Sequence, residues 1–212
     1  MSKAKRKPED HTPMTLHHIP GTLVLSRLLA APVLLWAALT GQSRFWLIGI
    51  LVYVFLSDVF DGVIARRLQV VTARLRVADS WADTLFYVCV ALAVWRLHRA
   101  LLGPFLIPLL IVMGLMSVNW AVAMLKFRRA MSFHAYSSKL WGLSLFAASV
   151  SLLGFSHAGG FLWAVIAVGI AGHLEGFVMT LILPRWAHEV SGIPEALRLR
   201  AEARVQACKP SP

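Results

Sequence analysis

The sequence predicts an all-α integral membrane protein with six transmembrane helices and both termini in the cytoplasm. Of the 212 residues, 58% are hydrophobic and only 15% are charged, and the mean hydropathy is +0.68. Apolar runs of about twenty residues, long enough to cross a bilayer as a helix, recur along the chain. Most of the residues behind the net charge of +11 lie at the ends of these runs, as membrane topology requires, so we expect no nucleic-acid partner.

The chain divides into three expected regions: a basic N-terminal tail over 1–19, a six-helix membrane domain over 20–184 and a polar C-terminal tail over 185–212. The N-terminal tail has no periodic apolar pattern, which is typical of a disordered segment facing the membrane. In the C-terminal tail, Glu and Arg four residues apart within 194–204 indicate a short amphipathic helix, solvated or lying on the membrane surface. The two cysteines show no disulfide or metal spacing.

The first three expected spans cover 21–40, 45–65 and 77–95. The first follows a basic stretch, as the apolar core of a signal peptide does, but its apolar run is too long for one, so we interpret it as a retained span. Gln42 and Arg44 mark the turn into the second span. Arg66 and Arg67 end the second span, and Arg96 follows the third.

The last three expected spans cover 101–125, 140–155 and 161–183. Pro104 and Pro108 lie near the start of the fourth, where an irregular first turn is tolerated. A basic loop over 126–139 precedes the fifth span, and Pro184 follows the sixth. Glu175 lies roughly 13 Å inside the sixth span at a rise of about 1.5 Å per residue, so it is expected either to line a cavity or to be protonated or paired within the bundle.

Lysine and arginine are distributed unequally between the two sides of these spans. With six spans, 17 of the 21 lie in the two tails and in the connections 66–76 and 126–139, whereas Arg44, Arg96 and Arg99 lie on the other side. The positive-inside rule therefore places the termini and the 66–76 connection in the cytoplasm. We expect the protein to reside in a bacterial inner (cell) membrane.

Four of the five aspartates lie between Asp58 and Asp83, inside or beside two apolar runs, where an isolated charge is costly. Asp58 and Asp61 are three residues apart and Asp79 and Asp83 are four apart, so each pair shares one face of a helix. The two helices are joined closely and are expected to pack as an antiparallel pair, which brings the four carboxylates together. Clustered carboxylates repel unless cations neutralise them, and hard divalent cations prefer oxygen ligands. The sequence therefore predicts a divalent-metal site.

The same residues resemble the signature of the CDP-alcohol phosphotransferase (CDP-alcohol phosphatidyltransferase) family, D-x-x-D-G-x-x-A-R-x8-G-x3-D-x3-D. The spacing is intact, and all but one of the fixed positions match. The matching residues are Asp58, Asp61, Gly62, Ala65, Arg66, Asp79 and Asp83. The departure is Leu75, where the family has its second glycine.

The resemblance implies an enzyme of phospholipid synthesis that transfers a substituted phosphoryl group from a CDP-alcohol, commonly CDP-diacylglycerol, to an acceptor alcohol with release of CMP. It implies Mg²⁺ or Mn²⁺ held by Asp58, Asp61 and Asp79, with Asp83 near the same metals and acting as the general base. The resemblance also implies that the protein lies in a lipid bilayer and that a second copy of the chain is its partner in a homodimer. Contacts to the CDP donor are expected from Asp58, Gly62, Ala65, Arg66 and Thr72.

The first span resembles the opening P-N-x-x-T-x-x-R-x4-P of the phosphatidylglycerophosphate-synthase type at Pro20, Arg27 and Pro32, whereas Gly21 and Val24 depart from it. Arg27 is expected either to snorkel to the interface or to contact a phosphate. Glycerol 3-phosphate is our expected acceptor, because this opening and several basic residues suit an anionic acceptor; inositol phosphate, serine and a phosphatidyl lipid stay open. The weaker candidates for binding the acceptor are Arg27, Arg128, Arg129, Lys139 and Glu175.

Three alternatives compete with the enzyme. Intramembrane carboxylates also mark cation or solute transporters, although these aspartates cluster near one face and no inverted repeat relates the two halves. Leu75 could mark a catalytically impaired relative that keeps the metal site. The aspartates could also be helix-end charges that headgroup water solvates.

Overall fold

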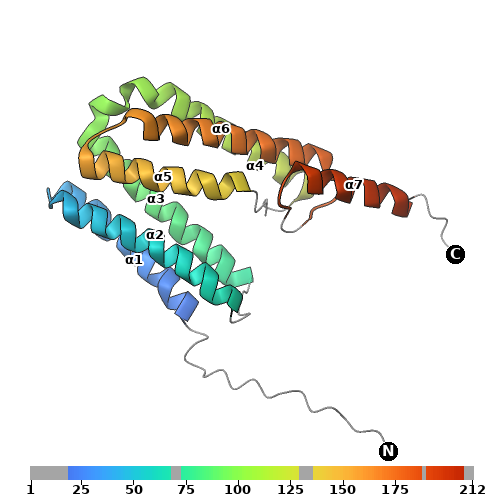
Figure 1. Cartoon of the computed structure of the whole chain (residues 1–212), viewed down its shortest axis with the longest axis horizontal. Helices are drawn as coiled ribbons and strands as arrows, with labels where there is room; N and C mark the ends of the chain where they lie inside the picture. The colour runs from blue at the N-terminus through green and yellow to red at the C-terminus, as the bar shows by residue number, and fades with distance from the viewer. Residues whose placement is uncertain (1–18, 68–72, 129–135, 188–189, 208–212) are drawn as a thin grey trace, which may run out of the picture. The chain divides into compact units, whose positions relative to one another are not determined.

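The computed structural model describes residues 19–67, 73–128, 136–187 and 190–207. The basic tail expected over 1–19 lies almost entirely outside this range. The helices in chain order are α1 (Ile19–Leu39), α2 (Arg44–Arg67), α3 (Ala73–Leu102), α4 (Leu106–Phe127), α5 (Tyr136–Phe155), α6 (Gly159–Ile182) and α7 (Ile193–Ala207), with the 3-10 turn η2 (Gly103–Phe105) before α4 (Figure 1). They fall into two compact units, Met1–Leu97 and His98–Pro212.

Helices α1 to α6 occupy the six expected spans. The largest difference is in α3, which continues past Arg96 to Leu102 and carries non-helical backbone at His98 (φ −131°, ψ 31°). Among the described residues, three stretches are long and apolar enough to cross a membrane. They are Gly21–Leu39, Ala78–Phe127, which includes both α3 and α4, and Gly159–Ile182. The described chain is therefore that of a helical membrane protein.

In the first unit, α1 and α2 form a hairpin through a turn at Gly41, whose φ of +71° suits glycine (Figure 1). The buried residues of α1 recur every three or four positions, which defines one packing face: Val24, Arg27, Ala31, Leu34 and Ala38. The buried residues of α2 repeat in the same way: Leu47, Leu51, Val54 and Asp61. The otherwise apolar packing face of each helix thus includes one charged residue, Arg27 in α1 and Asp61 in α2.

Helix α3 buries Ala82, Phe86, Val90 and Ala93, and Asp79 and Asp83 lie on the same face. In the described part of the chain, α2 and α3 meet at their aspartates and do not pack closely along their lengths. The expected antiparallel course of the two helices is present (Figure 1). At their meeting point, carboxylates of both helices contact one guanidinium group from α1.

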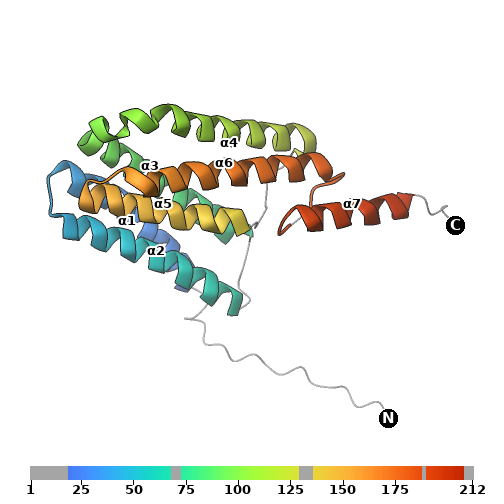
Figure 2. The ribbon, with the colours of Figure 1, turned by 45° about the horizontal axis from the view of Figure 1, so that its top comes forward.

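The second unit is built around α6, which packs against α4 and α5 (Figure 2). Buried Gly169 allows close approach, because a Cβ there would come within 2.9 Å of both Trp141 Nε1 on α5 and Val112 Cγ1 on α4. Thr180 on α6 is fully buried, and its hydroxyl lies 2.8 Å from the Gly176 carbonyl and 3.5 Å from Asn119 Oδ1 on α4. Lys126 Nζ donates to the carbonyls of Thr180 and Leu181, which satisfies the C-terminal end of α6.

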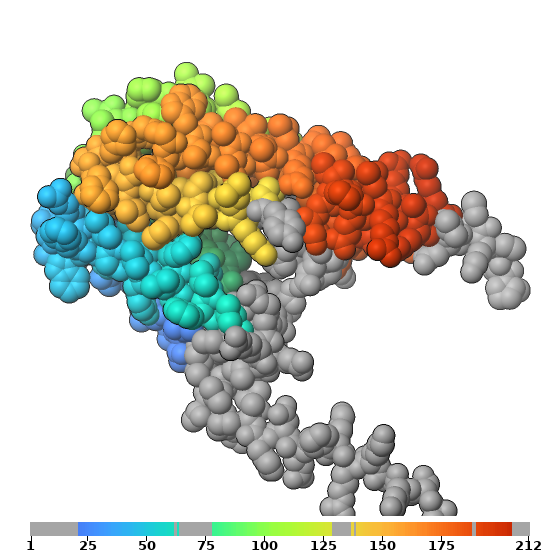
Figure 3. Space-filling model, in the orientation of Figure 1, coloured from blue at the N-terminus to red at the C-terminus, as the bar shows by residue number. Residues whose placement is uncertain are grey.

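Helix α7 covers the C-terminal end of α6, as the space-filling view shows (Figure 3). The contact is an apolar cluster of Met179, Leu183, Val190 and Ala196. The start of α7 is fixed by a hydrogen bond of 2.7 Å from the Ser191 backbone N–H to Glu195 Oε2, which lowers the pKa of the Glu195 carboxyl. The amphipathic helix expected over 194–204 is thus present, and it packs on the helical domain through its apolar side.

Candidate metal centre

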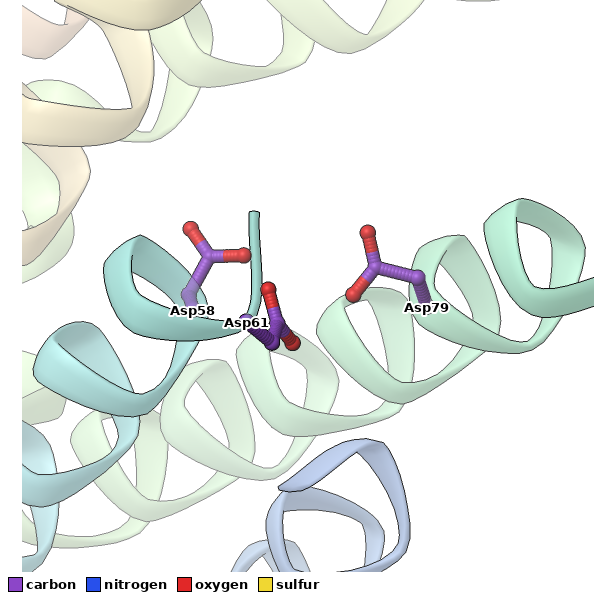
Figure 4. A group of neighbouring side chains, drawn as sticks. All are labelled: Asp58, Asp61 and Asp79. Atoms are coloured by element: carbon purple, nitrogen blue, oxygen red, sulfur yellow. The ribbon is translucent and has the colours of Figure 1, made fainter. Parts of the chain in front are cut away.

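Two helices of the first unit supply four aspartates to one place. Asp58 and Asp61 come from α2, one helical turn apart, and Asp79 comes from α3 and points toward them (Figure 4). One carboxylate oxygen from each of these three residues lies within 4.8 Å of the other two. Asp83, one turn after Asp79, reaches the same group through a shared ion-pair partner. The predicted convergence of the four carboxylates is therefore present in the structure.

That shared partner is Arg27 of α1, whose two terminal nitrogens contact all four aspartates. Nη1 lies 2.8 Å from Asp58 Oδ1 and 2.7 Å from Asp83 Oδ1. Nη2 donates to Asp61 Oδ2 and to Asp79 Oδ1. Arg27 Nε is buried without a hydrogen-bond partner, so the terminal nitrogens carry the pairing in the described structure. We call these five residues the aspartate cluster.

The cluster has a buried side and an accessible side. The Arg27 side chain is 0% exposed and that of Asp61 is 8% exposed. The side chains of Asp58, Asp79 and Asp83 are 47%, 36% and 39% exposed. Beside Arg27, the Tyr53 hydroxyl of α2 donates to Ser26 Oγ of α1 at 2.7 Å, which ties the two helices together at this level. The carboxylates of Asp58, Asp79 and Asp83 can therefore be reached from outside, whereas the guanidinium cannot.

The donor set fits a hard divalent cation. Mg²⁺ binds carboxylate oxygens at about 2.1 Å, so two ligands on opposite sides of the ion are roughly 4.2 Å apart. The observed spacing of Asp58, Asp61 and Asp79, up to 4.8 Å, is close to this value, and small side-chain movements would close the gap. Four carboxylates and one guanidinium also leave an excess of negative charge when all are ionised. This chemistry suits Mg²⁺ or Mn²⁺.

A family described as CDP-alcohol phosphatidyltransferase matches residues 17–183, which is most of the chain and includes all five residues of the aspartate cluster. The chain belongs to this family. A curated relative, the CDP-diacylglycerol–glycerol-3-phosphate 3-phosphatidyltransferase of Rickettsia felis, is 32% identical over 81 residues, which cover 37% of this chain and 45% of the relative. The match thus spans less than half of that relative's length. No solved structure matches the chain.

In this member of the family, the structure describes only part of the predicted donor site. Gly62, Ala65 and Arg66 lie in the last turns of α2, Gly62 directly after Asp61. Leu75, the departure from the signature, lies in the first turn of α3. The side chains of Ala65, Arg66 and Leu75, and the whole of Thr72, lie outside the described residues. Their predicted donor contacts stay predictions.

The predicted acceptor residues are spread over several elements. Arg128 ends α4 in a left-handed conformation (φ 53°), and Lys139 lies exposed in the first turns of α5. Glu175 of α6 is half-buried and lies near Gly192. A Cβ added to Gly192 would lie 3.4 Å from Glu175 Oε1. Arg129 lies outside the described residues. Arg27, the fifth candidate, contacts the four aspartates, and its predicted phosphate contact stays a prediction.

The sequence analysis missed that Arg27 pairs with the aspartates. The available signal was depth: Arg27 lies about seven residues inside the first span, and Asp58 lies about eight residues before the basic end of the second, both roughly 10–12 Å into the membrane domain at 1.5 Å per residue. Charges at similar depth in neighbouring membrane helices are expected to pair.

Proposed function

We propose that this protein synthesises a membrane phospholipid precursor by transferring a phosphatidyl group from CDP-diacylglycerol to glycerol 3-phosphate, with release of CMP. The observation that supports this most directly is the convergence of Asp58, Asp61 and Asp79 from two helices at the spacing of the family signature. The name of the Rickettsia felis relative supports the choice of donor and acceptor.

The residues of this chain can be assigned to the steps of that transfer. Asp58, Asp61 and Asp79 would hold Mg²⁺ or Mn²⁺, which when bound neutralises the diphosphate and stabilises the leaving CMP. Asp83 takes the proton of the acceptor hydroxyl as that oxygen attacks the β-phosphorus of the donor. The bond from that phosphorus to the CMP oxygen breaks, and CMP leaves with the electron pair.

Binding of the substrates is assigned by matching the family signature. Gly62 and Ala65 leave room for the nucleotide beside α2, and Arg66 and Thr72 contact the donor. Outside the signature, Lys139, Arg128 and Arg129 are the candidates for holding the acceptor phosphate. Arg27 and Glu175 are further candidates for contacts to the acceptor. Basic residues suit glycerol 3-phosphate better than an uncharged acceptor such as serine.

We also propose the membrane arrangement: six spans, both termini and the aspartate cluster on the cytoplasmic side of a bacterial inner membrane, and a homodimer. The distribution of lysine and arginine supports the orientation. Cysteines placed near residues 70 and 132 should react with a membrane-impermeant reagent only from the cytoplasmic side, and a cysteine near residue 158 only from the periplasmic side. Labelling in the opposite sense would reverse the proposed exposure of the site.

Leu75 favours a second candidate, a relative that keeps the metal site but has lost turnover. A leucine four residues before Asp79 lies on the same face of α3, where the family signature has glycine. The added side chain either shapes the pocket for another partner or weakens binding. An ion or solute transporter is less well supported, because the family match covers residues 17–183.

The deciding experiment uses purified protein with CDP-diacylglycerol, Mg²⁺ or Mn²⁺, and a panel of acceptors that includes glycerol 3-phosphate, inositol phosphate and serine. We expect metal-dependent CMP release and a lipid product of the mass given by glycerol 3-phosphate. Release with another acceptor would correct the substrate and keep the reaction. A folded protein that binds Mn²⁺ but releases no CMP would support the impaired relative.

A further inference from the structure

Arg27 is the one member of the aspartate cluster that the proposed reaction assigns neither to metal binding nor to proton transfer. It occupies a core position of α1, between Val24 and Ala31 on the packing face, and its side chain is 0% exposed. A buried arginine in a membrane helix is costly and needs partners of opposite charge. We propose that Arg27 is a positioning residue, a built-in cation that holds the metal-binding aspartates together from the buried side before any metal binds. The proposal rests on the metal site of the proposed function.

The pattern of contacts shows how one side chain can assemble the site. Each terminal nitrogen of Arg27 contacts one aspartate of α2 and one of α3: Nη1 contacts Asp58 and Asp83, and Nη2 contacts Asp61 and Asp79. The guanidinium therefore connects the two helices twice. Its planar, rigid fork fixes the directions of these bonds, which a lysine with a single nitrogen cannot reproduce.

Arg27 leaves room for a metal on the other side of the carboxylates. One guanidinium offsets one of the four negative charges, so the cluster keeps a strong attraction for divalent cations. Asp58, Asp79 and Asp83 each contact the guanidinium through one carboxylate oxygen, and their side chains are each more than a third exposed. A cation that arrives from the accessible side therefore meets carboxylate oxygens that the guanidinium does not cover.

The test is the affinity of the full-length protein for Mn²⁺, measured by the electron paramagnetic resonance signal of free Mn²⁺ without any lipid substrate. In Arg27→Gln, the carboxylates lose the group that orients them, and we expect the Kd for Mn²⁺ to rise about 10- to 100-fold, as for other residues that orient metal ligands. Arg27→Lys keeps the charge but cannot bridge the four carboxylates, so its Kd should lie between that of the wild type and that of Arg27→Gln. Arg44→Gln is the matched control, because Arg44 lies at the far end of α2 and packs over the Phe45 ring. Its Kd should equal that of the wild type.

An unchanged Kd in folded Arg27→Gln would overturn the proposal, and so would tighter binding, which would mean that Arg27 competes with the metal for the carboxylates. If Arg27→Gln does not fold, Arg27→Lys decides the question by the same criterion. Asp61→Asn separates this inference from the proposed function. If Asp61→Asn binds Mn²⁺ with the same Kd as the wild type, the proposed metal site is wrong. The role of Arg27 would then be wrong as well.

Discussion

Two groups of polar side chains join neighbouring helices of this protein in different ways. The aspartate cluster of the first unit joins α1, α2 and α3 through full charges, four negative and one positive. In the second unit, α4 and α6 are joined by Asn119, Lys126 and Thr180, which we call the α4–α6 polar contact. There, neutral groups and one lysine bond mainly to backbone carbonyls at the end of α6. When all groups are ionised, the first group carries an excess of negative charge, whereas the only full charge of the second group is that of the exposed Lys126.

The difference indicates what each group is for. Neutral buried groups that find hydrogen-bond partners stabilise a fold by modest amounts and leave nothing to attract a ligand. A buried ionic cluster with unmatched charge gains little stability and is retained where binding or catalysis requires it. We therefore expect substitutions in the aspartate cluster to change catalysis. Substitutions that affect only the packing of α4, α5 and α6, such as those in the α4–α6 polar contact, should change the free energy of unfolding without changing catalysis per folded molecule.

The largest expected effect is that of Asp61→Asn. Asp61 is the most buried of the four aspartates and a predicted metal ligand, so its loss removes charge stabilisation worth several kcal/mol in the transition state, or roughly a thousandfold in rate or more. CMP release at saturating Mg²⁺ measures the effect, and Asp58→Asn and Asp79→Asn should behave alike. Glu202→Gln is the control, because this exposed residue of α7 pairs only with Arg198 in the described structure. Near-normal turnover in Asp61→Asn would show that Asp61 is not a ligand.

Asp83→Asn should separate proton transfer from metal binding within the same cluster. If Asp83 is the general base, the variant should lose about 10²- to 10⁴-fold in the rate of transfer. Its affinity for Mn²⁺ and for the CDP donor should change little, because the other three aspartates are the proposed metal ligands. The measurements are single-turnover CMP release and Mn²⁺ titration. A large loss of Mn²⁺ affinity would instead make Asp83 a ligand.

The sequence predicted the helices better than it predicted how they meet. Apolar runs placed all six long helices, because hydrophobic length is a local property. The third span was predicted to close at Arg96, His98 and Arg99, and the backbone is non-helical at His98, after which α3 continues to Leu102. The local spacing of the aspartates placed each pair on one face, and the structure confirms this.

Contacts between distant segments were harder to predict. The pairing of Arg27 with aspartates 31 to 56 residues away depends on how α1 packs, and no local spacing encodes it. The same holds for the packing of α7 on α6 through Val190, because the C-terminal tail was judged by its charges alone. In both cases the missing information was which face of one helix meets which face of another.

In the second unit, Gly169→Ala should lower the free energy of unfolding by about 1–3 kcal/mol, the usual cost of overpacking. The new methyl group would lie 2.9 Å from both Trp141 Nε1 and Val112 Cγ1, so the helices must move apart. Gly142→Ala is the matched control, because a Cβ there meets no atom within 4 Å, and it should stabilise α5 by up to about 1 kcal/mol. Thermal unfolding in detergent measures both. Equal Tm shifts in the two variants would contradict the close approach at Gly169.

The smallest effect that we expect tests the α4–α6 polar contact directly. Thr180→Val keeps the shape of a fully buried side chain and removes the hydroxyl that lies 2.8 Å from the Gly176 carbonyl. The expected loss is about 1 kcal/mol, the typical net value of one buried hydrogen bond. Ser117→Ala is the control, because its hydroxyl donates to the Met113 carbonyl at the same distance but in an exposed position, and its stability should change by less. Turnover per folded molecule should match the wild type in both variants, since neither residue belongs to the aspartate cluster. A thousandfold loss of turnover in folded Thr180→Val would instead assign the α4–α6 polar contact to catalysis and remove the contrast between the two groups.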